Sequence, residues 1–242
     1  MQLPIILQSY TKQQLCDIGK QVRRHIPMTF KKRDMIRLLL MKPVKQHGGN
    51  DKKYASTDYW NQRYSNNQYD DFDWLFTYKE LKPIIHQYIN RKDKILVPGS
   101  GNARLSPDMY RDGFTDQDCI DISHEVTKKM GEKYKDMNGL DFIEMDILNN
   151  TLQHNHYDSI VDKSIIDTFA CHDDPNNKIQ KMFSEYHKCL KPSGICMLIS
   201  LHNKDWTLKH IDKNKWNILE SKNHHKENGK IHSTHVLQKS LN

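Results

Sequence analysis

The stretch ILVPGSGNARLS, from Ile95 to Ser106, decides the fold that this sequence predicts. It reads as a short apolar strand that runs into Gly99-Ser100-Gly101 and then into a helix. Glycine suits the end of such a strand because a Cβ there would block the close approach of a ligand to the backbone. A dinucleotide fingerprint would require a third glycine where Arg104 stands, and its absence favours a smaller adenosine ligand over a pyrophosphate. Taken alone, the pattern is also typical of a plain tight turn.

From Lys94 onward, short apolar runs alternate with longer helical patterns, which is typical of βαβ units and a mostly parallel sheet. The sequence predicts strands at Lys94–Pro98, Asp118–Ile122, Asp141–Met145, Ser159–Asp162 and Ile195–Ser200. It predicts helices near Ser106–Arg111, Ser123–Lys135 and Asn177–Cys189. Two last strands, Trp216–Glu220 and Ile231–Lys239, flank an Asn-Gly pair that supplies the positive φ of a tight turn. The fold class is therefore α/β, with an antiparallel hairpin closing the sheet.

Acidic residues stand at the ends of three consecutive predicted strands. Asp121 closes the second strand 20 residues after Gly101, a distance at which a carboxylate can accept both ribose hydroxyls of an adenosine ligand. Asp146 follows the third strand, where it can accept a hydrogen bond from an adenine amino group. Asp162 ends the fourth strand, and open α/β sheets bind ligands at this carboxyl edge. Together these positions favour a nucleoside site over isolated surface carboxylates.

The positive charge of the chain is concentrated at its N-terminus. Residues 1–53 hold 12 lysines and arginines against 3 aspartates, whereas the rest of the chain is close to neutral. We expect a basic helical extension at 1–41, with helices at Thr11–Arg24 and Lys31–Met41, a linker at 42–53 and one domain at 54–242. The basic arm is either an ordinary solvated face or a docking site for a polyanion or a larger complex.

Composition excludes several classes of protein. The hydrophobic share is 36%, the mean hydropathy is -0.84, and no run of eighteen apolar residues could span a bilayer. The five cysteines form no CxxC pair, so neither a disulfide framework nor a zinc site is expected, and a reducing compartment follows. Fourteen histidines raise the question of a metal, but the short pair His232 and His235 lies at i and i+3 of a strand, on opposite faces. We expect no metal.

Several motifs, in one order along the chain, together resemble the methyltransferase family that modifies translation elongation factor 1-alpha. They are YWNQRY at 59–64, FDW at 72–74, GSGNARLSPDMY at 99–110, IDIS at 120–123, MDIL at 145–148 and VDKSIID at 161–167. The resemblance implies a class I S-adenosylmethionine-dependent methyltransferase with a Rossmann-like, mostly parallel seven-stranded sheet. It also implies N-methylation of a protein lysine or N-terminal amine, elongation factor 1-alpha as first candidate substrate, and a cytoplasmic location. Residue by residue, it implies cofactor contacts from Arg63, Gly99, Gly101, Asn102, Asp121, Ile122, Asp146, Ile147 and Asp162.

The chemistry of methyl transfer assigns further roles. Arg63, on a predicted amphipathic helix, carries a guanidinium fork suited to the carboxylate of the cofactor. Because the sulfonium is already a strong electrophile, the protein mainly aligns the attack and keeps the acceptor amine neutral. Asp162 and Asp167 are the candidates to orient an ammonium and help its deprotonation.

One departure from the family's pattern leaves alternatives open. Ser164 stands where the family usually has the glycine of Asp-Lys-Gly, which adds bulk close to the methyl-transfer site. One alternative is a catalytically inactive methyltransferase-like subunit that serves as an interaction module. Another is an RNA or small-molecule methyltransferase, favoured if the segment from Thr11 to Met41 binds nucleic acid. The acid-poor first 33 residues also leave the mitochondrial matrix open as a location.

Overall fold

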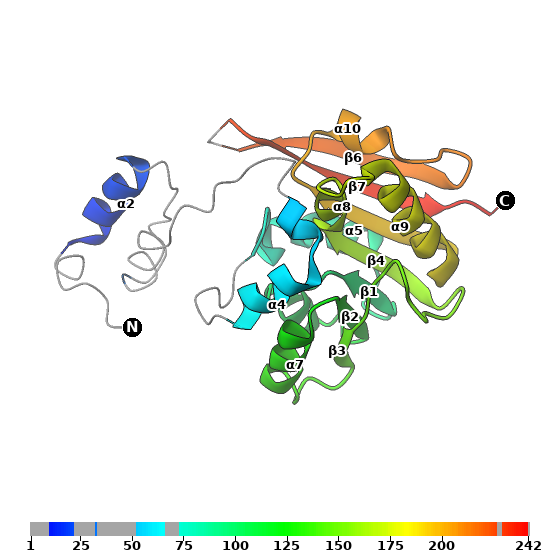
Figure 1. Ribbon diagram of the computed structural model, residues 1–242, viewed down its shortest axis with the longest axis horizontal. Coiled ribbons are helices and arrows are strands. Elements are labelled where there is room, and N and C mark those ends of the chain that lie inside the picture. The colour runs from blue at the N-terminus through cyan, green and yellow to red at the C-terminus, as the bar shows by residue number, and fades with distance from the viewer. Residues whose placement is uncertain (1–9, 22–31, 33–51, 66–72, 227–228, 242) are drawn as a thin grey trace. The chain divides into compact units, whose positions relative to one another are not determined.

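The computed structural model describes residues 10–21, 32, 52–65, 73–226 and 229–241 (Figure 1). The chain divides into two compact units, Met1–His47 and Gly48–Asn242, and this division falls inside the predicted linker.

In the first unit, α2 (Lys12–Gln21) lies within the first expected helix. Its start is capped because Thr11 Oγ accepts from Gln14 N at 3.2 Å while Gln14 Oε1 accepts from Thr11 N at 2.8 Å. The second expected helix lies outside the described residues, apart from Lys32.

In the second unit, the described residues form one sheet of seven strands. These are β1 (Ile95–Pro98), β2 (Gln117–Asp121), β3 (Leu140–Glu144), β4 (Tyr157–Lys163), β5 (Leu190–Ser200), β6 (Trp216–His225) and β7 (Ile231–Lys239). The spatial order is β3-β2-β1-β4-β5-β7-β6. Strands β1 to β5 are parallel, and β7 runs antiparallel to both β5 and β6. The predicted mostly parallel sheet with a C-terminal antiparallel hairpin is confirmed.

Helices precede the first strand and connect later ones. They are η1 (Lys52–Ala55), α4 (Thr57–Ser65), α5 (Tyr78–Tyr88), α6 (Leu105–Arg111), α7 (His124–Lys133), α8 (Ile165–Phe169), α9 (Pro175–Cys189) and α10 (Lys204–Leu208). The expected helices correspond to α6, α7 and α9, and YWNQRY lies in α4. Helices α5, α8 and α10 were not predicted. Helix α5 begins with a capping box between Thr77 and Glu80 and contains Pro83.

The central strands of the sheet are buried on both faces. On one face, Ile95 and Val97 of β1 share a core with Ile85 of α5 and Met109 of α6. On the other face, Leu96 belongs to a second core built with α8 and α9, the helices that Figure 1 shows beside β4 and β5. Alternate residues of one strand therefore serve two cores, as expected for a parallel sheet covered on both sides.

The order of the strands shows at which edge of the sheet a ligand would bind. Neighbours on the two sides of β1 are β2 and β4, so the direction of the connections reverses between β1 and β4. The carboxyl ends of β1, β2 and β4 meet there, and ligands of open α/β sheets bind at this edge.

None of the helices in the described part of the chain is long and apolar enough to cross a membrane. The described residues also contain no cluster of three or more potential metal ligands.

Candidate cofactor and acceptor site

The loop after β1 requires glycine at two positions. Gly99 and Gly101 have φ values of +59° and +53°, in the left-handed region. A Cβ on Gly99 would lie 2.1 Å from Ile165 Cδ1, and a Cβ on Gly101 would lie 2.7 Å from Tyr64 Oη. The loop is therefore enclosed by α8 on one side and α4 on the other, which leaves no room for side chains at either glycine.

Asp121 ties the end of β2 to this loop. Its Oδ2 accepts from Gly101 N and its Oδ1 from Ser123 N, both at 2.9 Å. The side chain is buried, and burial raises the pKa of Asp121 to about 6 despite these backbone donors. Asp121 and Gly101, predicted as partners in one site, are in direct contact.

The residues at this loop fit an adenosine-type ligand. Between the two glycines, the hydroxyl of Ser100 is buried with no hydrogen-bond partner. An unpartnered buried hydroxyl is costly in a folded protein unless a ligand or water uses it. A nucleoside needs close approach to the backbone and polar partners for its hydroxyls. The glycine loop provides the first, and the Ser100 hydroxyl and the Asp121 carboxylate provide the second.

Helix α4 brings Arg63 to the same edge. Asn61 Oδ1 accepts a hydrogen bond of 2.6 Å from Ser123 Oγ, which fastens α4 to the residues that follow β2. The Arg63 side chain is buried, and its guanidinium lies 5.9 Å from the Trp60 ring and 5.2 Å from the Trp74 ring. Arg63 Nη1 also donates to Tyr59 Oη at 3.4 Å. Aromatic faces hold a guanidinium by cation–π attraction, and its planar fork is suited to an anionic group.

Four further predicted cofactor residues differ from one another in burial and in hydrogen bonding. Asp146 follows β3, where its Oδ1 accepts from Leu148 N at 2.8 Å and its Oδ2 from Asn149 Nδ2 at 2.7 Å. Asn102 is buried in the glycine loop, and Ile122 is half-buried after β2. Ile147 packs in the second core. All four lie at the carboxyl edge, but their cofactor contacts stay predictions.

Asp162, at the end of β4, is 0% exposed. Its Oδ1 accepts from Ile165 N at 2.8 Å, and its Oδ2 accepts from Tyr186 Oη at 3.1 Å. Burial, reinforced by the nearby charge of Asp167, raises the pKa of Asp162 to about 7. Both carboxylate oxygens already have protein donors, so the group braces the turn after β4, and its predicted role in catalysis remains untested.

Asp167 joins the ends of β4 and β5. Its Oδ1 accepts from Ser200 Oγ at 2.6 Å, and its Oδ2 accepts from Ser164 Oγ at 2.9 Å and from Leu201 N at 3.0 Å. Burial raises the pKa of Asp167, and these donors partly offset the rise. The catalytic role predicted for Asp167 also remains a prediction.

Ser164 adopts a backbone conformation that favours glycine, the residue that the resemblance implies at this position. Its φ is +84° and its ψ is 9°, the left-handed region, at the residue that precedes α8. A residue with a Cβ is strained by roughly 1 kcal/mol in this region. The hydroxyl hydrogen bond to Asp167 offsets part of that strain.

A buried ion pair beside this turn was not predicted. Lys163 Nζ lies 2.7 Å from Asp73 Oδ1 and 3.3 Å from the Phe76 carbonyl oxygen. It connects the end of β4 to the segment before α5, 90 residues earlier in the chain. The FDW and VDKSIID motifs contain both residues, but nothing in their spacing shows that they meet.

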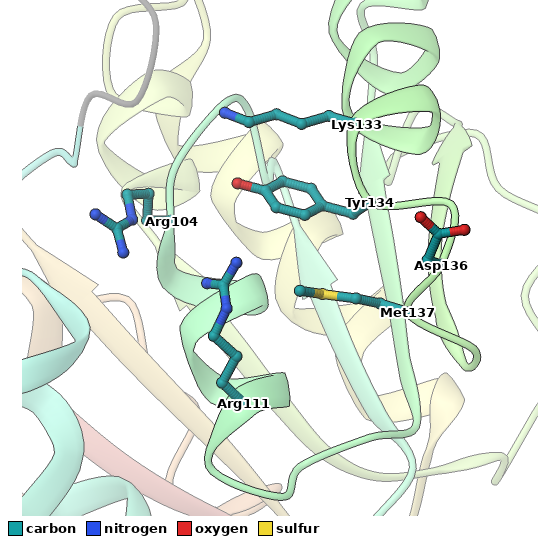
Figure 2. Close-up of a pocket in the computed structure, with 6 residues that line it drawn as sticks. All are labelled: Arg104, Arg111, Lys133, Tyr134, Asp136 and Met137. Atoms are coloured by element: carbon teal, nitrogen blue, oxygen red, sulfur yellow. The ribbon is translucent and has the colours of Figure 1, made fainter.

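A separate hollow of about 390 Å³ lies between α6 and the end of α7 (Figure 2). It is lined by Arg104, Arg111, Lys133, Tyr134, Asp136 and Met137. Arg104 and Arg111 both pair with Asp108, at 3.1 Å and 2.8 Å, and the cations of Arg111 and Lys133 lie over the Tyr134 ring. The hollow contains no predicted site residue.

Comparison with known proteins decides the family. A family model described as a methyltransferase domain matches residues 89–239, more than half of the chain. The chain belongs to the methyltransferase-domain family. The predicted class I methyltransferase family, the Rossmann-like fold class and the assignment as an enzyme of the methyltransferase type are confirmed.

Curated relatives narrow the comparison within this family. The eEF1A lysine and N-terminal methyltransferase homolog of Drosophila melanogaster is 35% identical over 152 residues, which are 62% of this chain and 23% of that protein. The Bos taurus eEF1A lysine and N-terminal methyltransferase is 28% identical over 173 residues, 69% of this chain and 25% of that protein. This methyltransferase thus spans about a quarter of the length of these relatives. The Mus musculus EEF1A lysine methyltransferase 4 is 22% identical, with 68% of each chain covered.

Solved structures share the fold. Magnesium protoporphyrin IX methyltransferase from Synechocystis, with bound S-adenosylmethionine, has a TM-score of 0.59 at 15% identity and covers 78% of this chain and 98% of its own. The PH0226 protein from Pyrococcus horikoshii has a TM-score of 0.56 at 18% identity, covering 74% and 99%. At these identities the likeness concerns the fold alone.

Proposed function

We propose that this methyltransferase transfers a methyl group from S-adenosylmethionine to a protein amine, a lysine side chain or an N-terminal amine. The observation that carries the cofactor part of the proposal is the contact between Asp121 and the glycine loop at Gly101, at the edge where β1, β2 and β4 end. The curated relatives carry names that describe eEF1A lysine and N-terminal methylation, so elongation factor 1-alpha is the first substrate to test.

As a member of its family, the protein uses S-adenosylmethionine as cofactor. The cofactor supplies an activated methyl group on a positively charged sulfur. We assign its ribose hydroxyls to Asp121, its carboxylate to Arg63, and close backbone approach to Gly99 and Gly101. Ser100, whose hydroxyl is buried without a partner, adds a polar contact in the same loop. Asp146 is assigned to the adenine amino group.

Calorimetric titration of S-adenosylmethionine into the purified protein tests this assignment. We expect binding that Asp121→Ala weakens at least about tenfold, since a lost hydrogen bond to a charged group is worth roughly 1.5–3 kcal/mol. Asp141→Ala is the matched control, because Asp141 is an exposed carboxylate on the neighbouring β3. Equal affinity in the wild type and the Asp121 variant would refute the ribose assignment.

An inactive subunit is the second candidate, and the strained Ser164 is the observation that favours it. Cofactor binding without methylation of elongation factor 1-alpha, of other cellular proteins or of RNA would support it. The basic extension at 1–41 would then be its docking arm. For the active enzyme we propose a cytoplasmic location, with the mitochondrial matrix as alternative, which imaging of a tagged chain would decide.

A further inference from the structure

His202 stands at the acceptor side of the sheet edge. It lies two residues beyond the end of β5, and Ser164 N donates to Ile199 O at 2.9 Å, which holds the ends of β4 and β5 side by side. The turn after β4 also borders the glycine loop, because Ile165 would collide with a Cβ on Gly99. His202 therefore follows the strand end that adjoins the turn after β4, at the same edge of the sheet as the glycine loop.

The loop that carries His202 is fixed by hydrogen bonds of its backbone. His202 N donates to Ser200 Oγ at 3.0 Å, and the same hydroxyl donates to Asp167. Further along, Lys204 N donates to Asn223 Oδ1 at 2.7 Å and Trp206 N to Asn203 Oδ1 at 3.0 Å. Hydrogen bonds at the loop and at the start of α10 (Lys204–Leu208) position these side chains before any substrate binds, which is what a catalytic group needs.

The imidazole of His202 faces Asp167. Nε2 lies 3.9 Å from Asp167 Oδ1, longer than a hydrogen bond but close enough to stabilise a positive ring. The Asp167 side chain is 3% exposed and the His202 side chain 21% exposed. In this network of Asp167, Ser200 and His202, the imidazole is therefore the proton acceptor that an incoming amine can reach.

The indole of Trp206 packs against the imidazole of His202 with the two ring planes tilted by 32°. The ring centroids of His202 and Trp206 are 3.8 Å apart, and those of Trp206 and His210 are 4.6 Å apart. An indole ring can bind an alkylammonium through apolar contact and cation–π attraction. The rings of His202, Trp206 and His210 therefore lie in one row.

The protonation state of His202 agrees with a role as base. Burial lowers its pKa and Asp167 opposes that shift, so the ring is neutral and can accept a proton at neutral pH. The titratable groups that face His202 are Asp167 from α8 and His210 from the residues after α10. Burial likewise lowers the pKa of His210.

We propose that His202 removes the proton from the acceptor ammonium, that Asp167 stabilises the resulting imidazolium, and that Trp206 lines the acceptor site. One proton passes from the ammonium to the unprotonated ring nitrogen of His202 and leaves a neutral amine. The amine nitrogen then forms a bond to the methyl carbon while the carbon–sulfur bond breaks, and the sulfur keeps the electron pair. The imidazolium afterwards releases its proton to water. This inference rests on the proposed function.

The first test compares His202→Gln with the exposed control His225→Gln in methylation of recombinant elongation factor 1-alpha between pH 6 and pH 9. We expect His202→Gln to lower kcat by about a hundredfold at pH 7, as loss of a general base does. Its rate should then rise steeply up to pH 9, as the free amine becomes populated without help. S-adenosylhomocysteine affinity should stay unchanged. A His202→Gln rate within threefold of the wild type, with the same pH profile, would overturn the proposal.

The second test does not depend on the identity of the substrate. The imidazole signals of the S-adenosylhomocysteine-bound protein are followed by NMR while n-butylammonium, a mimic of the lysine side chain, is added. We expect the His202 signal, assigned from its loss in His202→Gln, to shift and its pKa to fall, with the His225 signal unmoved. If the wild type fails to methylate elongation factor 1-alpha, the substrate proposal fails, and this titration alone decides on His202. An unmoved His202 signal would refute its place in the acceptor site.

Discussion

The two halves of the functional edge are built in different ways. At the ends of β1 and β2, backbone conformation dominates: two glycines have positive φ, and the Asp121 carboxylate accepts backbone N–H groups. At the ends of β4 and β5, side chains dominate: Asp162 and Asp167 accept donors from several elements, and Lys163 pairs with Asp73. The first half is shaped for close approach of a ligand, and the second is a preorganised polar network.

The comparison predicts that the second half depends most strongly on charge pairing. Asp73→Asn leaves the buried Lys163 ammonium without its counter-charge, so we expect a loss of about 3 kcal/mol in the free energy of unfolding. Glu80→Gln, which removes the more exposed pair with Lys226, should cost less than about 1 kcal/mol. Urea unfolding at pH 7.5 measures both. Equal losses in the two variants would show that burial does not distinguish the pairs.

The first half should depend on the absence of side chains. Gly101→Ala places a Cβ 2.7 Å from Tyr64 Oη at a φ of +53°, so we expect about 1–3 kcal/mol of destabilisation and at least about tenfold weaker cofactor binding. Gly131→Ala, in α7 with nothing within 4 Å of the new Cβ, should instead stabilise by up to about 1 kcal/mol. Adding Tyr64→Phe to Gly101→Ala should recover part of the loss, and no recovery would exclude the Tyr64 hydroxyl as the cause.

The acidity of Asp121 gives a third prediction. Its folded pKa is raised to about 6, so the carboxylate that accepts the ribose hydroxyls is neutralised as the pH falls below that value. We therefore expect the Kd for S-adenosylmethionine to rise by up to about tenfold per pH unit below pH 6 and to be nearly constant above pH 7. Calorimetry across this range measures it. Asp121→Asn should bind weakly with a flat profile, and a wild-type profile that is equally flat would contradict the assignment.

The difference between the β1–β2 half and the β4–β5 half of the edge also explains which residues the sequence could predict. Glycine spacing and acids at strand ends predicted that Gly99, Gly101 and Asp121 share one edge of the sheet, because those features are local and recur at fixed distances. The pair of Asp73 and Lys163 depends on residues 90 positions apart, and single-sequence patterns carry no such information.

Three helices were not predicted from the sequence, two because they are short and one because it contains a proline. Helices α8 and α10 have five residues each, too few for a 3.6-residue period to be visible. Helix α5 has a clear period, with Leu81 and Ile85 buried, but contains Pro83, which usually argues against a helix interior. His202 was missed for a related reason: its role is suggested by Asp167, which the fold and not the sequence brings beside it.

The smallest expected effect concerns Ser164, where the two halves meet. Ser164→Gly relieves left-handed strain of roughly 1 kcal/mol but removes the hydroxyl that donates to Asp167, a bond of about the same value. The free energy of unfolding should therefore change by less than about 1 kcal/mol. Ser164→Ala keeps the strain and loses the bond, so it should be the less stable of the two variants. If glycine raises the methylation rate and alanine does not, the backbone strain limits catalysis. If both variants match the wild type in rate while differing in stability, Ser164 is a structural residue and gives no reason to regard the protein as an inactive subunit.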